Sequence, residues 1–519
     1  MPDETTHLRR DNELLLKFGA EIKSRVPHVD PSNQRTTNPS PLVDLTQDLV
    51  ECARAHYGVE LSGKSPKVYG KLESKILGGS VKVRPAAGII EQAIESGKLR
   101  SEQTIFEATS GNFGLALGML RQIGLNVIVL VSRKLQGGVL DELENENAKT
   151  ISLDVDICPA PGLKMDQNLI VAKAATTNVR GQLAQLGLDL DAFDKVHGEV
   201  ESLLAKQDVI GLAKLLAKVY HGFCPEQYDN ELNVKSHQET TAVEIDQQLT
   251  ARGHSPATFK VITAFGTGGT STGLSRYALD KYGKKTVHVV FPSANQDVAG
   301  IRTRDKAVGL KFYQPELYAG EHEVDFQPAR KVLKYFVSKG YDIGESSALA
   351  LYSCIQMLNY GSENNFVVIL ADGIQKYLKN FETTPEKGGA LEVTIQQANS
   401  NPQDYESVIW THSIFKPREE GLQLVASAIG VDPRKIKIAR AGDIQAVVST
   451  GKLPETLESL VPKNGGRVLL ICMAGNTSLR MAEILANNGV PAQSLTGGIM
   501  GLPDAAKTEP DKLVQIATE

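Results

Sequence analysis

The chain has 519 residues, of which 41% are hydrophobic and 23% charged, the composition of a folded globular protein with more than one domain. Its net charge of −5 argues against a nucleic-acid surface, which needs a basic face. No apolar run approaches the roughly 18 residues that cross a membrane, the N-terminus lacks the apolar core of a signal peptide, and five scattered cysteines do not form a disulfide framework. We therefore expect a cytoplasmic protein without membrane or nucleic-acid partners.

Short β-branched runs alternate with helical stretches over most of the chain. Residues 1–40 are polar and predict a loose arm with one helix. From about 41 to 381, the alternation predicts parallel βαβ units with helices on both faces of the sheet. The clearest expected strands are residues 127–131, 260–265, 287–291 and 366–370.

Two segments interrupt this pattern before it resumes. Residues 176–221 show helical spacing of Leu, Val and Ile with no strand candidate, which predicts a helical insertion. Residues 386–404 are rich in glycine and polar residues and predict a linker or a short connecting strand. Strands and helices then alternate again, so we expect a first domain over 1–385 and a second, smaller α/β domain over 405–519.

A polar turn, "TSGN", joins an expected strand at 104–108 to a helix. Unpaired backbone N–H groups at such a helix start face outward, and the helix dipole favours an anion there. The side chains of Thr109, Ser110 and Asn112 add polar groups to this turn. The pattern fits either an anion-binding loop or an ordinary N-cap between strand and helix.

A glycine-rich turn follows the strand expected at 260–265 and repeats the arrangement. Its glycines and threonines form a concave set of donors that suits a phosphate. The spacing is not that of a dinucleotide-binding loop, and a plain tight connection is the alternative. The residues are Gly266, Thr267, Gly268, Gly269 and Thr270.

A lysine, Lys82, follows a Gly-Gly-Ser turn ahead of another helical pattern. Most lysines are solvated surface charges, so Lys82 by itself does not indicate a catalytic role. That role is expected only because of the motifs found elsewhere in the chain. Together these motifs resemble the fold type II pyridoxal phosphate enzymes of the cysteine synthase and cystathionine β-synthase group. The resemblance covers about 38–381 and rests on "PSPLVDL", "GGSVKVRPA", "TSGNFG", "CPEQYDN", "GTGGTSTG" and "DIGESSALAL".

The resemblance implies a two-subdomain α/β enzyme that binds pyridoxal 5′-phosphate and works as a homodimer without a metal. Lys82 would hold the cofactor as an imine and then act as the base that removes the α-proton. A neutral serine at the pyridine nitrogen suits elimination at Cβ followed by addition of a nucleophile. The implied cofactor residues are Asn112, the 266–270 turn and Ser346 at the ring nitrogen, and the implied substrate residues are Thr109, Ser110 and Gln227.

An arginine, Arg302, bears on the leaving group. Within the family, the branch that uses O-phosphoserine carries an arginine in a similar turn, and "AGIRTR" places Arg302 there. A guanidinium binds phosphate through two parallel charge-assisted hydrogen bonds, which an acetyl group does not require. The alternative is a surface arginine in a loop that also holds Arg304 and Lys306.

A cysteine, Cys472, stands where the strand expected at 467–471 meets a turn and a helix. Backbone N–H groups and the helix start would stabilise a thiolate or persulfide, whereas a buried strand-end cysteine would be inert. Residues 445–502 resemble the single-domain rhodanese sulfurtransferases, with "CMAGNTS" as the active loop and "SLTGGIMGL" as the closing turn. The resemblance implies a sulfur carrier, with a degenerate docking domain as the alternative.

Three functions fit these observations. The first is β-replacement on O-phosphoserine, or a related O-activated serine, that forms cysteine or a thio-amino acid with sulfur from a rhodanese persulfide. A small molecule or a carrier protein would donate that sulfur. The second is an amine β-replacement that gives 2,3-diaminopropionate, with a non-catalytic rhodanese-like domain. The third is a sulfur-trafficking scaffold that only binds pyridoxal phosphate.

Overall fold

The computed structural model describes two compact units. The first unit draws on residues 1–131, 135–150 and 213–378, and the second on 132–134, 151–212 and 379–519. The described residues are 13–59, 66–109, 111–132, 137–146, 148–153, 165–294, 296, 298–360, 365–377, 391–411, 415–440, 443–444, 447, 453–472, 476–502, 505 and 510–516.

The main sheet of the first unit has six strands in the order β10-β9-β8-β11-β4-β3. All neighbouring strands pair in parallel except β3, which pairs antiparallel with β4. Its central strands are buried on both faces, as the apolar runs in their sequence predict. The strands are β3 (Leu42–Asp44), β4 (Lys67–Leu72), β8 (Lys260–Ala264), β9 (Val287–Pro292), β10 (Gly320–Val324) and β11 (Asn365–Leu370).

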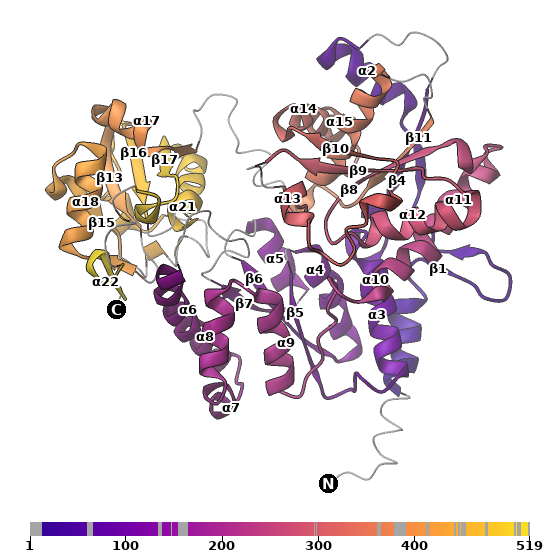
Figure 1. Cartoon of the computed structure of the whole chain (residues 1–519), viewed down its shortest axis with the longest axis horizontal. Helices are drawn as coiled ribbons and strands as arrows, with labels where there is room; N and C mark the ends of the chain where they lie inside the picture. The colour runs from indigo at the N-terminus through magenta and orange to yellow at the C-terminus, as the bar shows by residue number, and fades with distance from the viewer. Residues whose placement is uncertain are drawn as a thin grey trace. The chain divides into compact units, whose positions relative to one another are not determined.

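Helices cover this sheet and connect its strands, so the predicted βαβ units are confirmed (Figure 1). Apolar residues of β8, β9 and β11 form one core with residues of α11 and α12. The helices are α2 (Thr46–Tyr57), α3 (Val83–Glu95), α10 (Glu231–Ser236), α11 (Ala242–Ala251), α12 (Gly269–Tyr282), α13 (Arg304–Ala307), α14 (Phe326–Ser338) and α15 (Glu345–Tyr360), with the π-helical turn η5 (His237–Thr241) between α10 and α11.

A smaller sheet has the order β5-β6-β7. Its strands β5 and β6 pair in parallel, and α4 leaves the end of β5 through the "TSGN" turn. The elements are β5 (Thr104–Ala108), α4 (Asn112–Gly118), η4 (Met119–Ile123), β6 (Asn126–Ser132), α5 (Gly137–Asn145) and β7 (Lys149–Leu153).

A fully buried ionic cluster fixes the start of α3. Its arginine, Arg84, is two residues beyond Lys82 in the chain. The guanidinium of Arg84 donates to Glu73 at 2.8 Å and to Glu244 at 2.6 Å, and Lys71 donates to Glu244 at 2.7 Å. All four side chains are 0% exposed. Because each charge faces an opposite one, the cluster ties β4, α3 and α11 together without leaving a buried charge unpaired.

The second unit contains a five-stranded parallel sheet in the order β12-β17-β16-β13-β15. Alternate residues of β13 and β16 face two different cores, so both faces of these strands are buried. The strands are β12 (Glu392–Val393), β13 (Tyr405–Trp410), β15 (Ile436–Ile438), β16 (Arg467–Ile471) and β17 (Ala492–Leu495). Strands and helices alternate here as expected, but the unit is not limited to 405–519: β12 lies before residue 405, and residues 132–134 and 151–212 belong to the same unit.

The segment expected to be a linker, 386–404, is structured in its described part. Strand β12 pairs with β17 and forms the edge of the sheet, and α17 (Ile395–Ser400) follows with a capping box at Thr394. The alternative of a short connecting strand was therefore closer to the structure. Polar composition misled the prediction because an edge strand of two residues needs only one inward side chain, Val393.

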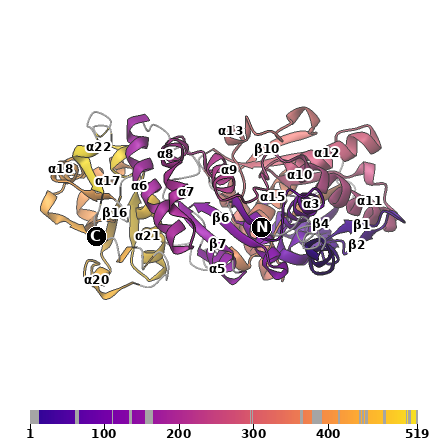
Figure 2. The same cartoon turned by 90° about the horizontal axis from the view of Figure 1, so that it is seen from below.

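The helices around this sheet include α18 (Glu419–Ile429) and α21 (Asn476–Asn487). The insertion expected at 176–221 is helical but its first helix begins earlier in the chain. Its helices are α6 (Met165–Gln185), α7 (Leu190–Asp194), α8 (His197–Ala205) and α9 (Val209–Val219). Helices α6 and α8 lie side by side in both views (Figure 1, Figure 2). Within the described part of the chain, we find no helix with the length and apolarity to span a membrane.

The remaining short elements connect those above. They are η1 (Gly19–Lys23), β1 (His28–Val29), β2 (Thr36–Thr37), η2 (Glu73–Lys75), η3 (Leu77–Gly79), η6 (Pro256–Thr258), η7 (Pro315–Leu317), η8 (Gln375–Tyr377), η9 (Pro402–Asp404), β14 (Phe415–Pro417), η10 (Pro433–Lys435), α20 (Glu455–Glu458), η11 (Ile499–Gly501), α22 (Pro510–Leu513) and β18 (Val514–Ile516).

Candidate active site

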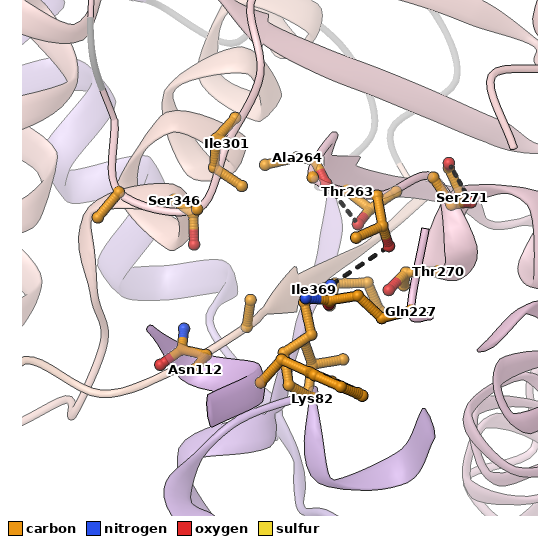
Figure 3. A pocket seen from close by; sticks show the side chains of 18 of the residues that line it. Lys82, Asn112, Gln227, Thr263, Ala264, Thr270, Ser271, Ile301, Ser346 and Ile369 are labelled. Carbon is orange, nitrogen blue, oxygen red and sulfur yellow. Dashed lines mark hydrogen bonds between the residues drawn. The ribbon is translucent and has the colours of Figure 1, made fainter. Parts of the chain in front are cut away.

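A pocket of about 800 Å³, with open solvent at its mouth included, lies beyond the carboxyl ends of β8 and β11. The starts of α3, α4, α12 and α15 all contribute lining residues. Figure 3 shows Asn112 and Ser346 on one side of the hollow and Thr270 and Ser271 on the opposite side. The carboxyl edge of a parallel sheet is where small-molecule sites form.

Lys82 is the N-cap residue of α3 and the only charged side chain among the described residues that line the pocket. Its Nζ donates a hydrogen bond to Oγ1 of Thr267 at 3.3 Å. Burial, and then the positive charge of Arg302, lower the pKa of Lys82 to about 8. The amine is therefore neutral far more often near neutral pH than a surface lysine, as a nucleophile or base requires.

The glycine-rich turn has no room for larger residues. Gly268 has φ +89°, and an added Cβ would lie 2.4 Å from the backbone oxygen of Phe312. A Cβ on Gly269 would lie 2.1 Å from Oδ1 of Asn233. The two glycines therefore keep side-chain atoms away from the backbone at the start of α12. The N–H groups and the helix dipole favour an anion at this position.

Hydroxyl groups complete this turn. Oγ1 of Thr267 accepts hydrogen bonds from Lys82 and, at 3.0 Å, from Nδ2 of Asn233. Thr270 lines the pocket, while Gly266 approaches Gly300 so closely that a Cβ would meet its oxygen at 2.8 Å. The turn predicted at 266–270 therefore faces the same cavity as Lys82.

Asn112 reaches the pocket from the first turn of α4, and both ends of its amide are held by side chains of the segment that follows β11. Its Nδ2 donates to Oδ2 of Asp372 at 2.8 Å, and its Oδ1 accepts from Lys376. Asp372 also accepts from the hydroxyl of Tyr377 at 2.5 Å. With a donor at one end and an acceptor at the other, the amide has one orientation.

Of the two hydroxyl residues predicted before Asn112, the structure describes only Thr109. The hydroxyl of Thr109 is buried and accepts from the backbone N–H groups of Gly111 and Gly114, each at 3.1 Å. Thr109 therefore shapes the tight turn between β5 and α4, whose N-cap residue is Gly111, and it is not among the described residues that line the pocket. Ser110 lies outside the described residues.

Gln227 and Ser346 both line the pocket. Nε2 of Gln227 donates to the backbone oxygen of Ala108 at 3.3 Å, and its backbone N–H donates to the buried carboxylate of Glu107. Burial raises the pKa of Glu107 to about 8. Ser346 stands in the first turn of α15 and is 6% exposed, so both predicted residues reach the cavity.

Arg302 follows the pocket residues Ala299, Gly300 and Ile301. Its Nη2 donates to the hydroxyl of Tyr228 at 3.0 Å, and its guanidinium lies 5.6 Å from the centre of that ring. Tyr228 itself lines the pocket. Arg302 is half-buried and is not itself a lining residue. It lies next to the pocket through Tyr228, and its charge lowers the pKa of Lys82.

Sequence reasoning missed three residues of this site: His237, Asp372 and Lys376. Each is buried, and each contacts a pocket residue from a distant part of the chain. Asp372 and Lys376 belong to the segment "ADGIQKYL". Two charged residues directly after an apolar strand could have indicated that this segment contributes to the site. Nothing in the sequence near His237 distinguishes it from a core histidine.

Cys472 belongs to the second unit and follows the last residue of β16. The connections that leave β13 and β16 run toward opposite edges of the sheet, so the switch in strand order falls between these two strands. The Sγ of Cys472 accepts from the backbone N–H of Ser478 at 3.4 Å and from its Oγ at 3.3 Å. Residues 473–475 of the predicted loop lie outside the described residues.

The lysine, the confined glycine turn and the held amide define a site for an anionic aldehyde cofactor in an α/β fold. The chain belongs to the pyridoxal-phosphate dependent enzyme family, whose model matches residues 49–372, and it therefore binds pyridoxal phosphate. The residues fit this cofactor, because the cradle at Gly268 and Gly269 leaves backbone donors for a phosphate and Lys82 supplies an amine.

Known proteins are similar to this chain at modest identity. Cystathionine beta-synthase of Saccharomyces cerevisiae is 26% identical over 341 residues, which cover 62% of this chain and 58% of that protein. Cysteine synthase of Staphylococcus aureus is 26% identical over 328 residues, covering 60% of this chain and 87% of that protein. A solved structure of O-ureido-L-serine synthase has a TM-score of 0.50 and 20% identity, with 71% of this chain and 96% of that chain covered; it supports the fold alone.

Proposed function

We propose that the first unit catalyses β-replacement on O-phosphoserine, or a related O-activated serine, to form cysteine or a thio-amino acid. The observation that carries the proposal is the position of Arg302, which contacts the pocket residue Tyr228 and acts electrostatically on Lys82. A pocket whose described lining holds no carboxylate, with the guanidinium of Arg302 beside it, suits an amino acid with a dianionic leaving group.

Each residue of the site has a separate role in this reaction. When bound, pyridoxal phosphate supplies an electron sink for chemistry at the α- and β-carbons of an amino acid. The turn 266–270 holds the cofactor phosphate, and the amide of Asn112 donates into the pocket from a fixed orientation. Lys82 takes the α-proton at Nζ, Arg302 binds the phosphate that leaves, and Gln227 contacts the substrate.

The proposal is tested by comparing two substrates in an Arg302→Ala variant. Loss of a charge-assisted pair should raise KM for O-phosphoserine by roughly a hundredfold, whereas KM for O-acetylserine should change little. Arg304→Ala is the control, because Arg304 is an exposed neighbour paired with Glu321. Equal effects of Arg302→Ala on both substrates would reject the phosphoserine assignment.

We infer that the second unit supplies the sulfur through Cys472. The thiolate of Cys472 attacks the sulfane sulfur of a donor such as thiosulfate, which releases sulfite and leaves a persulfide on the cysteine. The terminal sulfur of the persulfide then attacks Cβ as phosphate leaves, which would join the product to Cys472 through the remaining S–S bond. Two equivalents of a thiol reductant reduce that bond, are oxidised to a disulfide, release cysteine and regenerate the Cys472 thiol. The support is the place of Cys472 at the switch in strand order, with two hydrogen-bond donors from Ser478 on its sulfur.

The alternative with an amine nucleophile, which gives 2,3-diaminopropionate, uses the same first unit. It differs in needing no sulfur on Cys472. Turnover with ammonia or an amine that exceeds turnover with sulfide would favour it, and product analysis by mass spectrometry distinguishes the two. A homodimer and a cytoplasmic location remain predictions.

A further inference from the structure

A buried histidine, His237, lies behind the glycine-rich turn and contacts it. Its Nε2 is 3.2 Å from Oγ1 of Thr270, and its Nδ1 is 3.0 Å from Oγ1 of Thr241. The side chain is 0% exposed and stands in the π-helical turn η5. Turns of this kind widen a helix locally and recur at functional sites.

The packing leaves this histidine little freedom. An added Cβ on Gly273 of α12 would lie 2.8 Å from Cβ of His237, so the glycine lets η5 and α12 approach closely. Burial, followed by the charges of Arg84 and Lys82, holds the pKa of His237 well below its usual value. The ring is therefore neutral, with one N–H and one acceptor nitrogen.

A neutral ring allows two arrangements, and they have opposite effects on Thr270. If Nε2 carries the proton, it donates to Oγ1 of Thr270, and the hydroxyl proton of that threonine is free for an anion in the pocket. If Nδ1 carries the proton, Thr270 donates to Nε2 and turns a lone pair toward the anion, which repels it. In the first arrangement Thr241 donates to Nδ1.

We propose that His237 is a positioning residue that, as a neutral Nε2–H donor, fixes the hydroxyl of Thr270 as a hydrogen-bond donor to the phosphate of the cofactor. The proposal rests on the phosphate-binding role proposed above for residues 266–270. It predicts that His237 affects binding of the phosphate and leaves binding of the rest of the cofactor unchanged.

The test compares pyridoxal phosphate with pyridoxal, which lacks the phosphate, on the full chain after cofactor removal. His237→Met has similar length but no donor, and His237→Gln keeps an N–H. We expect the Met variant to raise Kd for pyridoxal phosphate by roughly tenfold or more, with Kd for pyridoxal within about twofold, and the Gln variant to retain most of the affinity. His254→Met, which removes a histidine bonded to Tyr69, should change neither constant.

A second variant, Thr270→Val, distinguishes failure of the His237 proposal from failure of the proposed phosphate site. Phosphate-specific loss in Thr270→Val with none in His237→Met would overturn the role of His237 and leave the turn assignment intact. No phosphate-specific loss in either variant would overturn both. Equal loss for both ligands in His237→Met would show a merely structural role and reject the inference.

A measurement on the wild-type chain does not depend on whether the variants fold. With ¹⁵N-labelled histidine and bound pyridoxal phosphate, the His237 resonances, assigned through His237→Gln, should show a protonated Nε2 and an unprotonated Nδ1. If His237→Gln does not fold, assignment follows from the contact between the ring and Thr270. The opposite tautomer, or a doubly protonated ring, would overturn the proposal.

Discussion

Nζ of Lys82 donates a hydrogen bond to Oγ1 of Thr267 at 3.3 Å, although the two residues are 185 positions apart. The contact joins the amine at the start of α3 to the turn at the start of α12. Both helix starts meet at the carboxyl edge of the main sheet, so the amine and the anion-binding turn face one cavity.

The pH dependence of cofactor capture follows from the pKa of Lys82. Only the neutral amine attacks an aldehyde, and a pKa lowered from 10.5 to about 8 raises the neutral fraction at pH 7 from roughly 0.03% to roughly 10%. The rate of covalent attachment to the cofactor-free chain should rise with pH, reach half its maximum near pH 8 and level off above it. Stopped-flow absorbance measures this rate.

Arg302 contributes to that pKa, so Arg302→Ala should move the midpoint to higher pH because a neighbouring positive charge is removed. Lys82→Ala should show no covalent attachment at any pH, while Lys75→Ala, at a half-exposed lysine of the same segment, should behave as the wild type. A midpoint near pH 10 in the wild type would contradict the assignment.

Gly268→Ala should weaken cofactor binding strongly. The new Cβ would combine an unfavourable φ of +89° with an approach of 2.4 Å to the oxygen of Phe312, so the turn must move. Gly283→Ala is a matched control, because Gly283 ends the same helix with φ +65° and open space around the added Cβ. Titration with pyridoxal phosphate should separate the two; equal Kd values would show that the cradle plays no part.

Arg84→Met should destabilise the first unit by about 3–5 kcal/mol, because it leaves Glu73 and Glu244 buried with one lysine between them. Urea denaturation followed by circular dichroism measures the loss. Arg304→Met removes an exposed ion pair with Glu321 and should cost no more than about 1 kcal/mol. Similar losses in both variants would contradict a special role for the buried cluster.

Cys472→Ser should abolish sulfur transfer from thiosulfate and leave β-replacement with free sulfide nearly intact. A serine hydroxyl cannot hold a sulfane sulfur, whereas free sulfide reaches the first unit without a carrier. Mass spectrometry of the wild type after donor treatment should show one added sulfur on the peptide that contains Cys472. Cys224→Ser, at a free cysteine of the first unit, should retain the transfer.

An inert structural cysteine at position 472 would give a different pattern. Both assays would then be nearly unchanged in Cys472→Ser, because serine is close to cysteine in size, and no sulfur adduct would form on the wild type. That result would leave the second unit as a docking domain and the first as an enzyme that takes its nucleophile from solution.

Most of the strands and the site motifs could be predicted from local sequence patterns. The strands at 127–131, 260–265, 287–291 and 366–370 could be predicted because strands buried on both faces are continuous apolar runs, and the structure contains them as β6, β8, β9 and β11. Lys82 and the 266–270 turn could be singled out because glycine, hydroxyl and amine groups at helix starts are recognisable in sequence.

Tertiary structure decided what surrounds those motifs. Asn112 meets Asp372 across 260 positions and Arg84 meets Glu244 across 160, and no local pattern specifies such a pair. The hydroxyl of Thr109 turned to its own backbone, the edge strand β12 arose within a polar segment, and His237 came to lie behind Thr270. Sequence periodicity reports which face of an element is apolar, whereas the partner of a buried polar group is set by how distant elements pack.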